Sequence, residues 1–314
     1  MAAVSVCAKE IKAIQKHLTQ ASTSSSSSSS LSSRTAVDLF RQLPNVNANS
    51  PAYLDAILRT GYKQKSFELK ALLQFLRGLP NPDHQLNGCW ILYEVDNLLL
   101  TSDHRQHSLG LAFFIYELKQ KLQQSPLKIR VDQFWREWYP PAIHAIVLGH
   151  PVTVKTFARN ELMYAPADDL RFDHERRRVF TWKETASWQQ PRDDELEPKW
   201  RFVPGNSEKS WFYIVNARYA NEHLYAANVQ VQDEHSIAKD YAFSWCAGNP
   251  GEQAQWELHA VSRDVFTFFN KERNVYLFAA PDQHHDDQRR LVLALAEDKA
   301  TEENKDARKW RLMV

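Results

Sequence analysis

The spacing of hydrophobic residues changes once along the chain, near residue 150. Before that point apolar side chains recur every three or four residues, as in Leu54, Ile57 and Leu58, which is typical of amphipathic helices. Beyond it they alternate with polar residues, as in Val152 and Val154, which is typical of strands with one buried face. The sequence therefore predicts a helical segment followed by a β-rich segment.

Three segments follow from this change and from one low-complexity tract. Residues 1–34 include a run that is almost entirely serine, which cannot bury apolar surface and is predicted to be disordered, with phosphorylation or O-glycosylation as an alternative role. Residues 35–150 are predicted to form an all-α bundle of four to six short helices, the last of them interrupted at Pro140-Pro141. Residues 151–314 are predicted to form a separate all-β domain.

The β-rich segment repeats one theme three times, and each repeat ends on a tryptophan. Trp200, Trp256 and Trp310 lie 56 and 54 residues apart, and each follows a short strand of the Leu/Met-aromatic-Ala type. A period held this closely indicates a repeated architecture. Each repeat has room for four strands, and three such units would close into a barrel with a hairpin cap, which leaves no exposed strand edge. We therefore predict an α+β multidomain protein: an N-terminal all-α helical bundle, then an all-β β-trefoil of three repeats of four strands.

Composition excludes several classes of function. The chain has 39 basic and 38 acidic residues, so charge gives no argument for a nucleic-acid partner or an anionic membrane surface. Only eight glycines are present, and no glycine-rich phosphate-binding motif occurs. No apolar run is long enough for an integral membrane segment.

The three cysteines, Cys7, Cys89 and Cys246, form neither a disulfide framework nor a metal-binding pair. A Cys89–Cys246 bridge is possible, but buried free thiols fit the scattered positions better. The N-terminus lacks the basic start and sustained apolar core of a secretory signal, and taken literally it predicts an intracellular protein.

Tryptophans supply the candidate binding residues. The three that end the repeats are expected in the barrel core, because they recur at the same place. Ricin-type lectins have a glutamine two residues before this tryptophan, whereas this chain has Pro198, Ala254 and Arg308, which disfavours a ricin-type sugar site. The remaining candidates for an aromatic binding platform are Trp182, Trp188, Trp211 and Trp245. Of these, Trp188 lies in a polar loop and is the best candidate for exposure.

Catalytic and metal-binding patterns are weak. The cluster His284-His285-Asp286-Asp287 is better explained as a solvated turn than as a metal site, and Arg176-Arg177-Arg178 as a solvated hairpin tip rather than a phosphate-binding patch. No serine-hydrolase, zinc-protease or deaminase motif occurs. We expect no enzyme activity, no cofactor and no metal.

The domain junction resembles one protein family. The segments Trp138–Ile143 and Gly149–Lys155, with the strand-and-turn sequences Tyr213–Tyr219 and Phe268–Asn274, are similar to the insect low-molecular-mass haemolymph lipoproteins, the microvitellogenin-like group. The resemblance covers residues 40–314. It implies a non-enzymatic, extracellular protein that binds lipid or glycan, with storage, transport or immune roles.

Three functions remain open from the sequence. The first is a haemolymph-type carrier, whose apolar ligand would lie in the helical segment along Leu72, Phe75, Leu111, Phe114, Ile115 and Leu118. These residues would otherwise fill the helical core. The second is an intracellular protein-interaction module that uses the trefoil as a scaffold for protein partners. The third is a lectin of a non-ricin kind.

Overall fold

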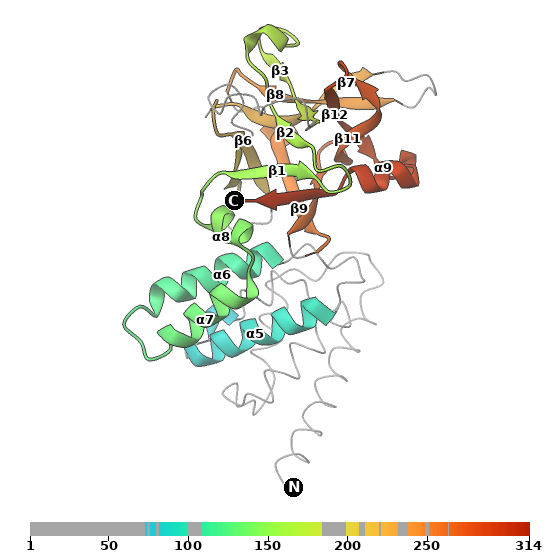
Figure 1. Ribbon diagram of the computed structural model, residues 1–314. Helices are drawn as coiled ribbons and strands as arrows, with labels where there is room; N and C mark the ends of the chain where they lie inside the picture. The colour runs from blue at the N-terminus through green and yellow to red at the C-terminus, as the bar shows by residue number, and fades with distance from the viewer. Residues whose placement is uncertain are drawn as a thin grey trace, which may run out of the picture. The chain divides into compact units, whose positions relative to one another are not determined.

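The computed structural model describes residues 73, 76–79, 82–98, 108–183, 199–206, 211–219, 221–231, 238–248, 251–262 and 264–314 (Figure 1). The chain divides into two compact units, Met1–Trp135 and Arg136–Val314. The serine tract and Leu72, Phe75 and Trp188 lie outside the described residues.

In the first unit, the described helices are α5 (Pro82–Leu98), α6 (Ser108–Lys121) and the first part of α7 (Lys128–Trp138). Side chains join them in pairs: the Trp90 ring on α5 lies 5.5 Å from that of Phe134 on α7, and Lys119 on α6 pairs with Asp132 on α7 at 2.8 Å. Both an aromatic contact and an ion pair therefore hold α7 against its neighbouring helices.

Helix α8 (Pro141–Val147) connects the helical segment to the strands. Pro141 occupies its first turn, where the missing N–H costs nothing. Gly149 follows the C-cap residue Leu148 with a φ of 73°, a conformation that suits glycine. The Gly149 N–H donates to the Ile146 carbonyl and the His150 N–H to the Ala145 carbonyl, which is a Schellman motif. This closure turns the chain directly into the first strand.

The second unit contains thirteen antiparallel strands in one sheet. The first repeat has β1 (Val152–Thr156), β2 (Leu162–Tyr164), β3 (Arg176–Arg178), β4 (Phe180–Trp182) and β5 (Lys199–Pro204). The second has β6 (Phe212–Asn216), β7 (His223–Val231), β8 (Lys239–Trp245) and β9 (Gln255–Ala260). The third has β10 (Val265–Asn270), β11 (Val275–His284), β12 (Arg289–Ala296) and β13 (Trp310–Met313). The shorter helical elements are η2 (Asp168–Leu170), η3 (Gly251–Ala254), η4 (Glu297–Lys299) and α9 (Glu302–Ala307).

Strand pairing closes the barrel and defines the fold. Strands β1, β5, β6, β9, β10 and β13 pair in that order, and β13 pairs again with β1, so the ring has no free edge. The remaining seven strands form three hairpins: β2 with the interrupted strand β3–β4, β7 with β8, and β11 with β12. The hairpins are connected to one another, because β12 pairs with both β4 and β8, and β3 pairs with β8. A six-stranded barrel with three connected hairpins is a β-trefoil.

The three closing tryptophans confirm the threefold arrangement. Trp200, Trp256 and Trp310 are each 0% exposed. Each indole N–H donates to a backbone carbonyl of its own repeat: that of Met163 at 3.0 Å, of Leu224 at 2.8 Å and of Leu277 at 3.1 Å. The repeated tryptophan is therefore conserved within the chain both for core volume and for one equivalent hydrogen bond.

The predicted fold class is wrong in its helical part and in its strand count. The described residues are mostly β, and their helices are short; they do not make an all-α bundle ahead of the sheet. Helical periodicity identifies amphipathic helices but not what they pack against, and α8 packs against β1, β5 and β13. The count is thirteen rather than twelve because the third strand of the first repeat is interrupted at Val179. Its first part pairs with β8, and its second part with β2 and β12.

Three charge pairs tie each repeat to the next. Arg177 in the first repeat binds Glu222 in the second, at 2.9 Å. Arg290 in the third binds Glu161 in the first, at 3.1 Å. Asp240 in the second repeat binds Arg273 in the third, at 3.0 Å, which completes the cycle. Here the hairpin residue is the acid and its partner the base, the reverse of the other two pairs. Strand register makes Arg177, Asp240 and Arg290 equivalent, because each faces a residue in the hairpin of a neighbouring repeat. Arg177 faces Ser244, Asp240 faces Ala294 and Arg290 faces Thr181.

Candidate functional site

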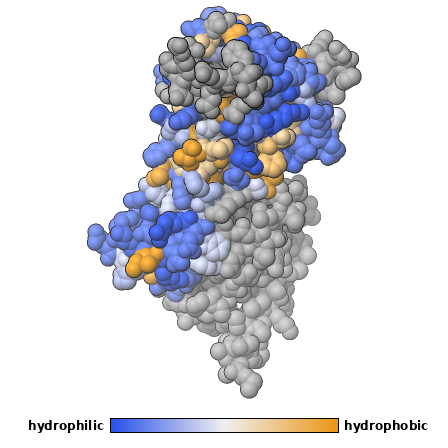
Figure 2. All heavy atoms as spheres, viewed as in Figure 1, coloured by the Kyte–Doolittle hydropathy of each residue, from blue (hydrophilic) through white to orange (hydrophobic). Residues whose placement is uncertain are grey.

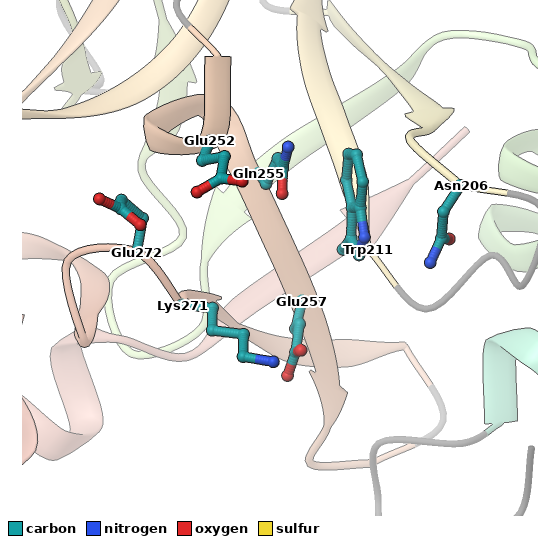
Figure 3. A pocket seen from close by; sticks show the side chains of 7 residues that line it. All are labelled: Asn206, Trp211, Glu252, Gln255, Glu257, Lys271 and Glu272. Carbon is teal, nitrogen blue, oxygen red and sulfur yellow. The ribbon is translucent and has the colours of Figure 1, made fainter. Parts of the chain in front are cut away.

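One pocket of the β-trefoil unit contains a tryptophan that the sequence marked as a candidate. Its volume is 480 Å³, and its lining is polar except for one ring (Figure 3). The lining residues are Asn206, Trp211, Glu252, Gln255, Glu257, Lys271 and Glu272. They come from the loop that follows β5, the residue before β6, the η3–β9 segment and the β10–β11 turn.

Trp211 is held in place by its neighbours. The Gly205 N–H donates to the Trp211 carbonyl at 2.9 Å, and the indole lies against the glycine. A Cβ added to Gly205 would lie 1.5 Å from Cζ3 of the indole. On another side the ring meets Tyr213 edge to face, with centroids 5.3 Å apart and planes at 88°. The position of this half-buried ring therefore depends on the absence of a side chain at residue 205.

Strand alternation directs two polar side chains toward the pocket. Gln255 and Glu257 flank Trp256 on β9. Since Trp256 points into the core, its two neighbours point outward to the pocket side. The Glu257 carboxylate also contacts the His259 ring nitrogen at 3.3 Å. The wall formed by β9 is thus set by the same register that buries the closing tryptophan.

The remaining wall carries charge. Lys271 and Glu272 lie in the turn after β10, and Glu252 lies in η3. In Figure 3 the ammonium of Lys271 points toward the Glu257 carboxylate, while Glu252 and Glu272 lie on the side of Gln255 away from Trp211. Three carboxylates against one ammonium give the pocket a negative balance.

This arrangement is chemically suited to binding. The carboxylates accept hydrogen bonds, the two amides both donate and accept them, and the tryptophan ring supplies an apolar contact surface. Among the described residues, no group of three or more His, Cys, Asp or Glu side chains could hold a metal ion.

Two other predicted aromatic residues lie elsewhere. Trp182 is 7% exposed, and its ring packs against Tyr164 and under Arg289. Trp245 is half-buried on β8, with its ring edge-on to Tyr225 at 5.5 Å. They face Leu162 and His223, so the two tryptophans lie at the same place in the hairpins of repeats one and two. They do not join Trp211 in one platform.

The predicted apolar groove residues that the structure describes are interior. Leu111, Phe114, Ile115 and Leu118 on α6 are all at most 2% exposed. Cys89 and Cys246 are free thiols, and burial raises the pKa of Cys246 to about 11. No helix in the described part of the chain is long and apolar enough to span a membrane.

The histidine–aspartate cluster is a turn stabilised by Asp286. Its carboxylate accepts from the backbone N–H groups of Gln288 and Arg289 and pairs with the Arg289 guanidinium. Burial acts to raise the Asp286 pKa, but these donors outweigh it and hold the pKa below the usual value. Burial, and then the charge of Arg290, lowers the pKa of His284.

The arginine run is not the solvated tip that the sequence predicted. Arg176 pairs with Asp173, and Arg178 donates to the Arg171 carbonyl at 3.1 Å. Arg177 between them is 1% exposed, because the middle residue of a three-residue strand points to the opposite face. Glu161 and Glu222, each one residue before the second strand of its repeat, were the sequence signal for these buried pairs.

Comparisons with known proteins give fold likeness only. No family matches the sequence, and no curated protein matches it either. A salivary protein from a Culex species, of the Cysteine and Tryptophan-Rich family, is 18% identical with a TM-score of 0.37, covering 52% of this chain and 92% of that chain. The designed threefold-symmetric protein ThreeFoil is 13% identical with a TM-score of 0.35, covering 52% and 98%. The cytolethal distending toxin from Actinobacillus actinomycetemcomitans is 15% identical with a TM-score of 0.37, covering 52% and 90%. The trefoil assignment accordingly rests on the strand pairing of this chain itself.

Proposed function

We propose that this protein is a non-catalytic binding module whose second trefoil repeat binds a glycan in the Trp211 pocket. The observation that carries the proposal is the indole of Trp211, fixed against Gly205 at a pocket whose other lining residues are all polar. Sugars present hydroxyl groups at their edges and C–H groups on their faces. A polar pocket with one aromatic ring matches both surfaces.

The polar lining favours a glycan over a lipid. A fatty acyl chain would leave the pocket's carboxylates and amides desolvated without partners, at about 1–3 kcal/mol for each group. In addition, the predicted apolar residues on α6 are buried among their neighbours. A hydroxyl-rich ligand instead replaces the water that these groups lose.

The test is a glycan array probed with the full chain, followed by calorimetry on any glycan that binds. Trp211→Ala removes the ring, and we expect a loss of binding of about tenfold or more, since stacking on an aromatic ring contributes on the order of 1–3 kcal/mol. Trp245→Ala removes another half-buried tryptophan of the same repeat, one that does not line the pocket, and should leave affinity unchanged. An array without signal above background would contradict the proposal.

A haemolymph-type carrier role, with an extracellular location, is the more specific form of this proposal. Its support is the resemblance of the segments Trp138–Ile143 and Gly149–Lys155 to that family. Fractionation of native tissue with an antibody to this chain tests it: recovery from extracellular fluid with a bound glycan or lipid is expected, and recovery from cytosol with protein partners would contradict it.

A further inference from the structure

The pocket breaks the threefold pattern of the barrel at the surface. Strand register makes Pro151, Trp211 and Val265 equivalent, because the residue that follows each of them faces a closing tryptophan. Val152 faces Trp200, Phe212 faces Trp256 and Phe266 faces Trp310. The second repeat alone has an aromatic residue at this position. Nothing in the barrel frame requires it, since proline and valine occupy the same place.

Charge is inverted at the same place. The residue after the closing tryptophan is Arg201 in the first repeat and Arg311 in the third, but Glu257 in the second. The residue before the closing tryptophan is Lys199 in the first repeat and Lys309 in the third, but Gln255 in the second. Two cationic positions are therefore replaced by an acid and an amide only where the tryptophan is present.

The adjoining turn completes the difference. Each closing tryptophan faces the last residue of a first strand: Trp200 faces Asn216, Trp256 faces Asn270 and Trp310 faces Thr156. The two residues that follow are Ala217-Arg218, Lys271-Glu272 and Phe157-Ala158. Only the second repeat's pocket therefore receives a carboxylate from this turn, and Glu252 in η3 adds another.

We infer that the ligand of this pocket carries a positive charge, and that the ligand class is an amino sugar with a free, protonated amine, such as a glucosamine oligomer. This inference rests on the proposed glycan-binding function and specifies its ligand. A protonated amine donates charge-assisted hydrogen bonds to carboxylates, and the face of an indole attracts cations. Lys271 offsets only one of the three carboxylates.

The barrel supplies its own matched variants. Glu257→Arg gives the second repeat the residue that the first and third repeats already hold at this strand position, so the frame tolerates it. Arg201→Glu makes the reverse change in the first repeat. Both variants change charge by the same amount on equivalent strands, and only the first one changes the pocket. Melting temperatures equal to that of the wild type confirm that both fold.

The experiment compares two tetrasaccharides of equal length by calorimetry with the full chain, one of glucosamine and one of N-acetylglucosamine. At about pH 6 the free amine of the glucosamine oligomer carries a positive charge, whereas the acetylated amine is neutral. We expect the glucosamine oligomer to bind about tenfold tighter or more, because a hydrogen bond to a charged group is about twice as strong as a neutral one. Glu257→Arg should remove this preference, and Arg201→Glu should keep it.

The outcomes separate the inference from the function on which it rests. Equal affinity for both oligomers would overturn the charged-ligand inference and leave glycan binding in place, as would binding of neutral glycans alone. A preference that survives Glu257→Arg would also overturn it, because the selectivity would then arise outside the pocket. No binding of any glycan would overturn both.

Discussion

Removing the carboxylate of Glu222 should destabilise the trefoil unit strongly. Arg177 and Glu222 are 1% and 8% exposed at their side chains, and the guanidinium donates from Nε and Nη2 to both carboxylate oxygens, with a shortest distance of 2.9 Å. Removing one partner of a buried ion pair costs about 3–5 kcal/mol. Arg177 would keep the Pro166 carbonyl, Asp168 and the Tyr219 ring as partners, so we expect Glu222→Ala to cost about 3 kcal/mol, at the lower end of that range.

The third charge pair is the internal reference. Arg273 and Asp240 are 25% and 10% exposed at their side chains, so solvent already screens their attraction. Asp240→Ala should therefore cost only about 1 kcal/mol. The assay is equilibrium urea unfolding of the full chain, followed by tryptophan fluorescence, with Ser244→Ala as a control that removes only a hydroxyl donor to Glu222. The reasoning is refuted if Glu222→Ala costs no more than Asp240→Ala.

Three further predictions follow from single contacts. Gly205→Ala should abolish glycan binding while leaving the barrel folded, because its Cβ would displace the Trp211 ring; calorimetry and near-ultraviolet circular dichroism check this, and unchanged affinity would contradict it. Trp256→Phe should lower the free energy of unfolding in urea by about 3 kcal/mol, because it leaves the buried Leu224 carbonyl without its donor and opens a small cavity. A loss of less than about 1 kcal/mol would contradict this prediction. Because the pKa of Asp286 is lowered in the folded state, its contribution to stability is complete above the unfolded-state pKa near 4 and is lost as the pH falls through the folded pKa. Asp286→Asn should therefore flatten the acid limb of a plot of melting temperature against pH. An unchanged acid limb would argue against this role.

The β-trefoil could be predicted because its determinants recur locally. Trp200, Trp256 and Trp310 each fill the core and bind a backbone carbonyl, so all three were held at a nearly constant spacing that the sequence displays. The interruption at Val179 could not be predicted, since it depends on which neighbouring strands the two halves meet. The helical segment was overestimated because periodicity does not reveal the partner of a helix.

The pocket was only partly predictable. Trp211 is visible as one of several tryptophans outside the repeated position. Its pocket, however, brings together side chains that lie as far apart in the sequence as Asn206 and Glu272, which are separated by 66 positions. Only the register between β9 and β10 brings Gln255 and Glu257 beside the turn that holds Lys271. The exchange of Arg201 and Arg311 for Glu257, by contrast, can be seen once the closing tryptophans are aligned.

The repeats differ in a way that separates frame from site. At two sets of interior positions the repeats hold the same residue or exchange residues in matched pairs: the three closing tryptophans, and the charge pairs in which Asp240 and Arg273 reverse the charges of Arg177 and Glu222. At the pocket the second repeat differs from the other two without a compensating exchange. Neither of the other repeats has an aromatic residue at the position of Trp211 or an acid at the position of Glu257. Packing and buried charge constrain the first set, because a mismatch there would leave a cavity or an unpaired ion. Neither constraint applies to a half-buried indole and an outward-facing carboxylate, so their joint appearance in one repeat is better explained by a ligand than by the stability of the barrel.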